Sequence, residues 1–408
     1  MHHMPDSRNW FPPTPEMRRR SFNRAQRQGM HIEVQGRVLL NFAANDYLGL
    51  SLHPGVCHAA QEAIAQHGMG SGASRLVSGD DPLLHALEAE LAAWKGFEAA
   101  MLVGSGMLAN MGLLPALADR HSTLFCDRLN HASLVDGARL AGCRVARYAH
   151  LDMAQLAELM QADASSGSHR KLIVSDGVFS MDGDCADLPA LMALAEAYDG
   201  LLLLDDAHGF GVLGEGGRGL SSECALAGHA RLVEVGTCGK SLGSYGAFIL
   251  GTQPMIEGLR QRLRGMTYST ALPPAVCAAS LAALHIVQDG EVVHRLHERL
   301  DFFRAQAALL ELPLMDAHTP IQGLLLGSEA RALDAAARLR REGFFVPAIR
   351  PPTVPEGTAR LRITVSAAHS HADIQGLTSA LRRVLNGLNS LNGIKHPDGL
   401  GDADEGKA

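Results

Sequence analysis

A lysine surrounded by small residues is the position best suited to covalent or base chemistry. Lys240 lies in the segment Thr237-Cys-Gly-Lys-Ser-Leu-Gly, directly after the largely apolar residues 232–236. Small neighbours leave room for a flat molecule beside the amine. A lysine in such a pocket loses solvation, so its pKa falls and it can act as a nucleophile or a base. On this window alone, an exposed lysine in a Gly/Ser loop is the more common explanation.

An aspartate upstream changes that balance. Asp205 ends the apolar run Leu201–Leu204, and His208 follows three positions later. A strand ending in Asp, followed 35 residues later by a lysine among glycines, is typical of a pyridoxal phosphate site. There the carboxylate of Asp205 would keep the pyridine nitrogen protonated, and Lys240 would hold the aldehyde as a Schiff base. We therefore predict pyridoxal 5'-phosphate as the cofactor.

A glycine-rich segment, Gly104-Ser-Gly106-Met107, connects a predicted strand to a predicted helix. Its glycines allow backbone amides to approach a phosphate at the positive end of the helix. The segment also fits the dinucleotide-binding pattern G-x-G-x-x-A, with Asp127 about 20 residues later, so a nicotinamide-dependent dehydrogenase is an alternative. Two observations argue against a dehydrogenase. It would leave Asp205, His208 and Lys240 without roles, and about 100 residues precede the glycine-rich motif.

Other polar residues have equally good local explanations. His131 could lie over an aromatic cofactor or donate to a substrate carbonyl, and it could equally cap the helix that follows. Ser180 fits a turn, and Thr237 fits either a phosphate ligand or an ordinary strand end. Arg360 and Arg362 alternate onto one face of a predicted strand. One of them could bind a carboxylate in bidentate fashion, although a solvated sheet edge is the usual explanation.

Most of these residues follow the ends of predicted strands. From residue 99 onward, strands are expected at 100–103, 123–126, 144–148, 172–175, 201–204, 232–236 and 247–250, and helices at 107–117, 133–140, 153–161 and 188–198. The alternation predicts βαβ units in a mostly parallel, doubly wound sheet. Ligands of such sheets bind at the carboxyl ends of the strands, so the polar side chains should converge on one crevice.

The chain is expected to divide into four parts. These are an N-terminal arm with a short helix (16–28) and a strand over residues 1–45, a large α/β domain that binds the cofactor over 46–285, a small α+β domain over 286–388, and a disordered tail over 389–408. A long helical stretch is expected from 275 to about 310. Within the small domain we expect strands at 321–326, 345–349 and 360–365 and helices at 332–342 and 372–388.

Composition argues against several classes of protein. Of the 408 residues 47% are hydrophobic and 19% charged, which is ordinary for a soluble globular enzyme. The net charge of −7 provides no basic footprint for nucleic acid or for a membrane surface. Seven cysteines without a C-x-x-C pair predict reduced thiols in the cytoplasm and no metal site. We expect no signal peptide, and no apolar run approaches the roughly 18 residues of a transmembrane helix.

Taken together, these motifs resemble those of the α-oxoamine synthases, pyridoxal phosphate enzymes with the aspartate aminotransferase fold (fold type I). The resemblance covers about residues 16–388. The motifs that carry it are Asn45-Asp-Tyr-Leu-Gly-Leu, Ser105-Gly-Met, Asn130-His-Ala-Ser, Gly177-Val-Phe-Ser-Met-Asp-Gly-Asp, Asp205-Asp-Ala-His-Gly, Thr237-Cys-Gly-Lys and Tyr268-Ser-Thr. Met107 and Asp176 depart from the family pattern, which more often has an aromatic residue and a glutamate at these positions.

The resemblance implies a role for each candidate residue. Lys240 corresponds to the Schiff-base lysine, Asp205 to the partner of the pyridine nitrogen and His131 to the residue that stacks on the ring. The phosphate would be held by Gly106, Met107 and Thr237, and by Ser269 and Thr270 of a second subunit. The ring hydroxyl would be bound by Ser180 and His208, and the substrates by Arg18, Asn45, His131, Thr353 and Arg362. A site completed by a neighbouring chain implies a homodimer.

The resemblance also implies a reaction. The stretch Ala348–Arg362 is most similar to the members that make a biotin precursor from L-alanine and a pimeloyl thioester, carried on coenzyme A or acyl carrier protein. The implied reaction is a decarboxylative condensation in which Lys240 removes the α-proton and His131 donates to the new ketone. Arg362 should then matter for alanine, and Arg360 far less. The alternatives are another family member, such as one that acylates glycine, and a binding protein without activity.

Overall fold

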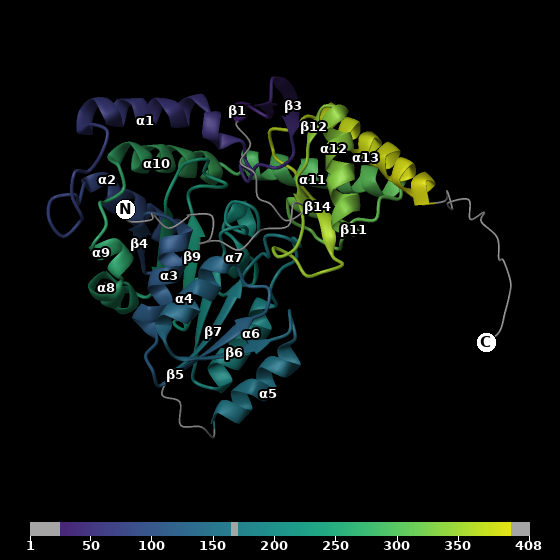
Figure 1. The fold of residues 1–408 in the computed structure, drawn as a ribbon. Coiled ribbons are helices and arrows are strands. Elements are labelled where there is room, and N and C mark those ends of the chain that lie inside the picture. Colours follow the sequence, from purple (N-terminus) through teal and green to yellow (C-terminus); the bar gives the residue numbers. More distant parts are fainter. Residues whose placement is uncertain (1–24, 165–169, 393–408) are drawn as a thin grey trace, which may run out of the picture.

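The computed structural model describes residues 25–164 and 170–392 (Figure 1). Arg18, most of the helix predicted over 16–28 and the tail after residue 392 lie outside the described residues. The end of that predicted helix is wrong, because Ala25–Gln28 forms a strand, β1, which pairs with β2 (His31–Val34). A hairpin turn at Gly29, which has a φ of +62°, joins the two strands.

The larger part of the described chain is built on a sheet of seven strands in the order β4-β10-β9-β8-β7-β5-β6. The strands are β4 (Ala99–Val103), β5 (Ser122–Asp127), β6 (Arg144–Tyr148), β7 (Arg170–Asp176), β8 (Leu201–Asp205), β9 (Leu232–Thr237) and β10 (Ala247–Gly251). Within this sheet the pairings of β10 with β4 and with β9 are antiparallel, and the other four pairings are parallel. The predicted mostly parallel sheet is therefore confirmed.

Helices cover both faces of this sheet. They are α1 (Pro54–His67), α2 (Pro82–Lys95), α3 (Gly106–Leu117), α4 (Ala132–Ala141), α5 (Met153–Ala164), α6 (Leu188–Ala197), α7 (Leu220–Glu223), α8 (Gln253–Arg262), α9 (Arg264–Thr267) and α10 (Pro274–Gln288). Successive strand residues point to opposite faces, so Leu202 and Leu204 enter one core cluster and Leu203 enters another. Burial on both faces explains why these strands read as continuous apolar runs.

A smaller unit follows α10. Its sheet has the order β11-β14-β13, formed by β11 (Ile321–Gly327), β13 (Ala348–Ile349) and β14 (Ala359–Thr364), and it packs with α11 (Glu291–Leu309), α12 (Glu329–Arg341) and α13 (His371–Asn392). The strand predicted over 345–349 is in fact two short strands, because Val346-Pro347 separates β12 (Phe344–Phe345) from β13.

The N-terminal strands belong spatially to this smaller unit. β3 (Arg37–Asn41) pairs in parallel with β12, and Leu40 and Phe42 lie in the same core cluster as the side chains of α13. Figure 1 shows the purple N-terminal strands beside the yellow-green C-terminal elements. This pairing joins segments about 300 residues apart in sequence, and the predicted arm did not include it.

The long helix predicted from 275 to about 310 is interrupted. Gly290, with a φ of +79°, separates α10 from α11. The first turns of α11 place Val292 and Leu296 in the large core, and its later turns place Leu300 and Phe303 in the small one. One helix therefore connects the two cores, and the domain boundaries proposed at residues 45, 285 and 388 stay predictions.

No single helix in the described part of the chain is long and apolar enough to cross a membrane. Helices α10 and α11 meet the length and composition requirement only as a pair, and they meet at an angle of 68°.

Candidate active site

A cavity of about 180 Å³ lies where β7, β8 and β9 end and α3 begins. Its lining consists of Gly106, Met107, His131, Ser133, Asp176, Asp205, Ala207, His208, Thr237 and Lys240. Seven of these ten residues were singled out from the sequence as cofactor or catalytic residues. The expected convergence at the carboxyl ends of the strands is therefore what the fold produces.

Lys240 faces two carboxylates across this cavity. Desolvation lowers the pKa of its amine to about 8, while the negative charges of Asp205 and Asp176 oppose that shift. An amine with such a pKa is partly unprotonated near neutral pH, whereas an exposed lysine is not. The geometry thus gives Lys240 the properties of a nucleophile or base, as the small neighbouring residues suggested.

Asp205 is buried and held by two donors. The side-chain amide of Asn110 donates to Oδ2 at 2.6 Å, and the backbone N–H of Ala207 donates to Oδ1 at 3.0 Å. A carboxylate has lone pairs left after two such bonds and can accept another donor from the cavity. Asn110 also donates to Ser133 Oγ at 2.9 Å. Sequence reasoning missed Asn110, whose one signal is its place one helical turn after Gly106.

His131 both caps a helix and lines the cavity. Its Nδ1 accepts from the backbone N–H of Ser133 at 3.3 Å and lies 2.7 Å from Ser133 Oγ, so a neutral ring carries its proton on Nε2. Burial lowers the pKa of His131, the charge of Lys240 lowers it further, and the charge of Asp205 raises it. The helix-cap explanation for His131 is confirmed, and its expected role towards a cofactor or substrate stays a prediction that its place in the cavity allows.

Asp176 anchors the backbone of this histidine. The N–H of His131 donates to Asp176 Oδ2 at 2.7 Å. Burial, with the nearby charge of Asp205, raises the pKa of Asp176 well above its usual range. Burial beside a second carboxylate therefore disfavours the charged form of Asp176.

His208 is fixed by a tyrosine that sequence reasoning did not single out. The hydroxyl of Tyr47 lies 2.5 Å from His208 Nδ1, and both residues are buried. Burial raises the pKa of Tyr47 to about 12, and burial with the charges of Lys240 and Arg362 lowers that of His208 well below its usual range. The tyrosine is then the donor, and His208 carries its own proton on Nε2. Tyr47 lies within a motif quoted from the sequence, but its partner is 161 residues away.

Arg362 lies on the central strand of the small sheet. Its guanidinium donates to the carbonyl oxygen of Ser180 at 2.6 Å, to Asn45 Oδ1 at 3.2 Å and to Thr364 Oγ1 at 3.1 Å. Three predicted site residues, Asn45, Ser180 and Arg362, are therefore brought together, although none of the three is among the residues that line the cavity, and their expected roles stay predictions. Arg360 and Arg362 are only 3% and 5% exposed, so the solvated-edge explanation is wrong for both.

Three other predicted residues lie apart from the cavity. Ser269 and Thr270 follow α9 and line a separate small pocket with Arg75 and Gly104. Thr353 is exposed in a turn in which its N–H donates to the carbonyl of Arg350. Their expected roles stay predictions.

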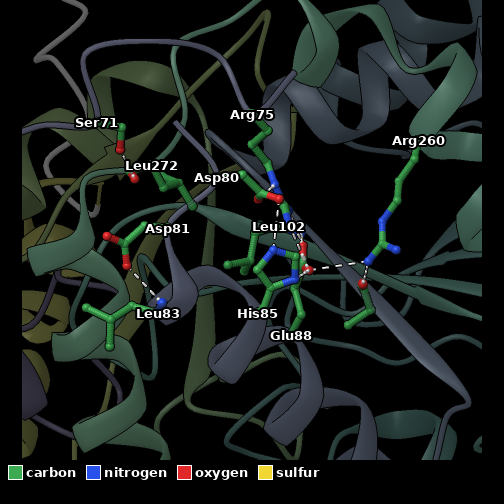
Figure 2. Close-up of polar contacts among 11 residues, drawn as sticks. Ser71, Arg75, Asp80, Asp81, Leu83, His85, Glu88, Leu102, Arg260 and Leu272 are labelled. Atoms are coloured by element: carbon green, nitrogen blue, oxygen red, sulfur yellow. Dashed lines mark hydrogen bonds and ion pairs between the residues drawn. The ribbon is translucent and has the colours of Figure 1, made fainter. Parts of the chain in front are cut away.

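The buried side chain of Glu88 contacts several elements around the pocket of Ser269 and Thr270 (Figure 2). Glu88 on α2 accepts from the backbone N–H of Leu102 in β4 at 2.8 Å. It also pairs with Arg75 and, at 3.3 Å, with Arg260 on α8. Since β4 leads directly into the glycine-rich segment at residue 104, Glu88 links that segment to α2, to α8 and to the loop that carries Arg75.

The same loop is fastened to the segment of Ser269 and Thr270. Ser71 Oγ donates to the carbonyl of Leu272 at 2.7 Å, a contact drawn in Figure 2. The N–H of Ala271 donates to the carbonyl of Ala73 at 3.0 Å. These bonds fix the position of the two hydroxyl residues relative to β4.

Comparison with known proteins assigns the chain to a family. A family model described as aminotransferase class I and II matches residues 37–381. The chain belongs to the aminotransferase class I and II family. Its α-oxoamine synthase branch of pyridoxal phosphate enzymes and the predicted fold type I are confirmed by the relatives below.

Two curated relatives are 8-amino-7-oxononanoate synthases. The one from Acidithiobacillus ferrooxidans is 48% identical over 355 residues, which cover 87% of this chain and 90% of the relative. The one from Anaeromyxobacter dehalogenans is 49% identical over 361 residues, which cover 88% and 89%.

Two solved structures share the fold. Serine palmitoyltransferase from Sphingomonas wittichii has a TM-score of 0.84 and 27% identity, covering 89% of this chain and 91% of its own. The 8-amino-7-oxononanoate synthase from Francisella tularensis has a TM-score of 0.74 and 27% identity, covering 86% and 99%.

The donors around the cavity suit the cofactor of this family. Lys240 offers an amine for the aldehyde, and Asp205 offers a buried carboxylate for the pyridine nitrogen. The first amides of α3, at Gly106 and Met107, point along the positive end of a helix, where a phosphate is stabilised. Thr237 Oγ1 donates to the carbonyl of Gly246 at 2.9 Å, so this hydroxyl must exchange that bond to donate to a phosphate. Among the described residues no group of His, Cys, Asp and Glu could hold a metal.

Proposed function

We propose that this chain is a pyridoxal phosphate-dependent acyltransferase that condenses L-alanine with a pimeloyl thioester. The products are 8-amino-7-oxononanoate, carbon dioxide and the free carrier thiol. The observation that carries the proposal is the placement of Lys240, Asp205 and His131 around one cavity. The relatives with 45–49% identity, which are 8-amino-7-oxononanoate synthases, support the choice of substrates. The alternative within the branch is a glycine C-acetyltransferase.

The first half of the reaction removes a proton from alanine. Pyridoxal phosphate, when bound, supplies an electron sink for the charge that develops at the α-carbon. Asp205 stabilises a proton on the ring nitrogen, which strengthens that sink. Lys240 takes the α-proton, and its pKa of about 8 suits a base near neutral pH. Arg362 and Asn45 bind the carboxylate of alanine.

The second half forms and breaks carbon bonds. The α-carbon bonds to the thioester carbonyl as the carbon–sulfur bond breaks, and the thiolate leaves and takes up a proton. The carboxylate then departs as carbon dioxide, and the α-carbon is protonated again by Lys240. His131, whose proton is on Nε2, donates to the ketone oxygen and stabilises the charge that develops there.

We further propose a homodimer with shared sites. Ser269 and Thr270 of one chain would reach the phosphate in the site of the other, while Arg18 and Thr353 would contact substrate. Exposed apolar side chains beside this segment support a covered surface: Val77 and Tyr268 are 78% and 72% exposed.

All seven cysteines are free thiols, which supports a cytoplasmic location.

The test is a substrate panel with the protein loaded with pyridoxal phosphate. L-alanine should react with pimeloyl-coenzyme A or pimeloyl-acyl carrier protein to give a product with the mass of 8-amino-7-oxononanoate. Glycine with acetyl-coenzyme A is the competing pair, and Lys240→Ala is the inactive control. Turnover of the glycine pair alone would assign the chain to the alternative function, and comparison of the two pimeloyl donors identifies the carrier.

A further inference from the structure

The loop between β7 and α6 is held by two arginines from the small sheet. Arg360 and Arg362 lie two residues apart on β14, so their side chains share a face. Arg362 donates to the carbonyl of Ser180, and Arg360 Nη1 lies 2.5 Å from Asp182 Oδ1. The side chains of Arg360 and Asp182 are 4% and 16% exposed, so this ion pair is nearly buried.

The same loop is anchored at its other side to the cavity. The N–H of Gly177 donates to the carbonyl of Asp205 at 2.7 Å. Gly183 packs so closely on β11 that a Cβ there would lie 2.1 Å from the carbonyl oxygen of Ile321. Thr319 Oγ1 also donates to the carbonyl of Gly183 at 2.8 Å. The loop therefore connects the end of β8, where Asp205 lies, to the small sheet that carries Arg362.

Arg362 is held at four points and has capacity for a ligand. A guanidinium carries five N–H donors. Three of them serve the bonds to Ser180, Asn45 and Thr364, and the guanidinium also hydrogen-bonds the hydroxyl of Tyr47, so not every donor is used within the described part of the chain. The charge of Arg362 reaches the cavity, because it contributes to the lowered pKa of both Lys240 and His208.

We propose that the Arg360–Asp182 ion pair is a positioning element that fixes Arg362 for the carboxylate of the amino-acid substrate. The inference rests on the proposed function of Arg362. It reverses the expectation that Arg360 matters far less than Arg362.

Loss of Asp182 would act on Arg362 in two ways. It would leave the charge of Arg360 buried and unpaired, one pleat from a second positive charge. It would also release the loop whose Ser180 carbonyl orients Arg362. Both effects move the guanidinium, and neither removes a hydrogen bond of the Asp205 carboxylate or the amine of Lys240. The affinity for a carboxylate should therefore fall while the affinity for an amine does not.

The test compares L-alanine with ethylamine, which has the same amine but no carboxylate. Each is titrated into the holoenzyme, and the dissociation constant is read from the absorbance of the bound cofactor. Asp182→Asn and Arg360→Met should each raise the dissociation constant of L-alanine about tenfold, which is the effect of losing one charge-assisted contact. The dissociation constant of ethylamine should stay within about twofold of the wild-type value. The double variant should bind L-alanine no more weakly than the single variant with the larger dissociation constant, because the same ion pair is removed in all three proteins.

Matched controls separate positioning from general damage. Asp334→Asn breaks a half-buried Arg–Asp pair on α12, Arg338 with Asp334 at 2.9 Å, and should leave both dissociation constants unchanged. Arg360→Lys keeps the charge, so its dissociation constant for L-alanine should lie between those of Arg360→Met and wild type. This variant provides a readout if the larger changes prevent folding. The proposal would be overturned if the dissociation constants of L-alanine and ethylamine rose equally, or if that of L-alanine were unchanged in Asp182→Asn. If the wild type responds to glycine and not to alanine, the proposed substrate is wrong, and glycine with methylamine tests the same positioning.

Discussion

At the scale of single residues, the lowered pKa of Lys240 makes a prediction about stability. The unfolded lysine keeps its proton up to its ordinary pKa of 10.5, whereas the folded one releases it near 8. Between these values the unfolded state binds more protons, so the free energy of unfolding rises with pH. Without cofactor, Lys240→Met should therefore be most stable relative to wild type below pH 8, and the difference should shrink towards pH 10.5. Urea unfolding of both proteins across this range checks it, and parallel curves would contradict the burial of this amine.

Asn110 leads to a second prediction at this scale. Its amide donates to Asp205 at 2.6 Å and so orients the carboxylate that would stabilise the protonated ring. Asn110→Ala should slow exchange of the alanine α-proton about tenfold, the effect of one hydrogen bond to a charged group. Asp205→Asn should slow it by orders of magnitude, because the carboxylate itself is lost. Exchange in deuterium oxide, followed by NMR, gives both rates. Equal rates in Asn110→Ala and wild type would show that Asp205 needs no support from α3.

Which site residues could be predicted from sequence depends on how local their signals are. Lys240, Asp205 and His208 stand beside apolar strands or glycines, so two short windows about 35 residues apart, taken together, reveal them. Asn110 and Tyr47 act through partners 95 and 161 residues away, and no short window contains that information.

At the scale of elements, the same distinction explains the fold. Strands buried on both faces, such as β8, are continuous apolar runs and were predicted. β1 is a short polar strand, Ala-Gln-Arg-Gln, whose pattern carries no period, and it was taken for the end of a helix. The parallel pairing of β3 with β12 depends on contacts across the whole chain. The break at Gly290 was missed because a single glycine is tolerated within many helices.

Glu88 provides the prediction at this scale. The buried carboxylate of Glu88, on α2, contacts β4, α8 and the loop of Arg75. If its charge is removed, the nearly buried guanidinium of Arg75 loses this ion-pair partner. Glu88→Gln should lower the free energy of unfolding by about 3 kcal/mol. Asp136→Asn, which breaks an exposed ion pair with Arg139 on α4, is the control and should cost about 0.5 kcal/mol or less. Urea denaturation measures both. Similar losses in the two variants would show that the Glu88 network is no stronger than a surface pair.

At the scale of the whole molecule, the site draws on parts that are far apart. The large sheet supplies Asp205 and Lys240, the small sheet supplies Arg362, and α11 joins the two cores. Ser269 and Thr270 do not reach the cavity of their own chain, since they line a different pocket. If they hold the phosphate, as we propose, they do so in the site of a second copy of the chain, and mixing two variants can test this.

The mixing experiment uses two variants with defects in different parts of the proposed shared site. Lys240→Ala lacks the base, and the double variant Ser269→Ala/Thr270→Ala has a weakened phosphate site. In a mixed dimer, one site collects both defects, and the other combines an intact Lys240 with intact Ser269 and Thr270. Random exchange makes half of the dimers mixed, so about a quarter of wild-type sites should be restored. Activity is measured at limiting cofactor, where the phosphate defect is largest, after the proteins are mixed and exchange is complete. If activity stays at the average of the two variants alone, each site is built within one chain, and Ser269 and Thr270 have no part in binding the phosphate of a neighbour.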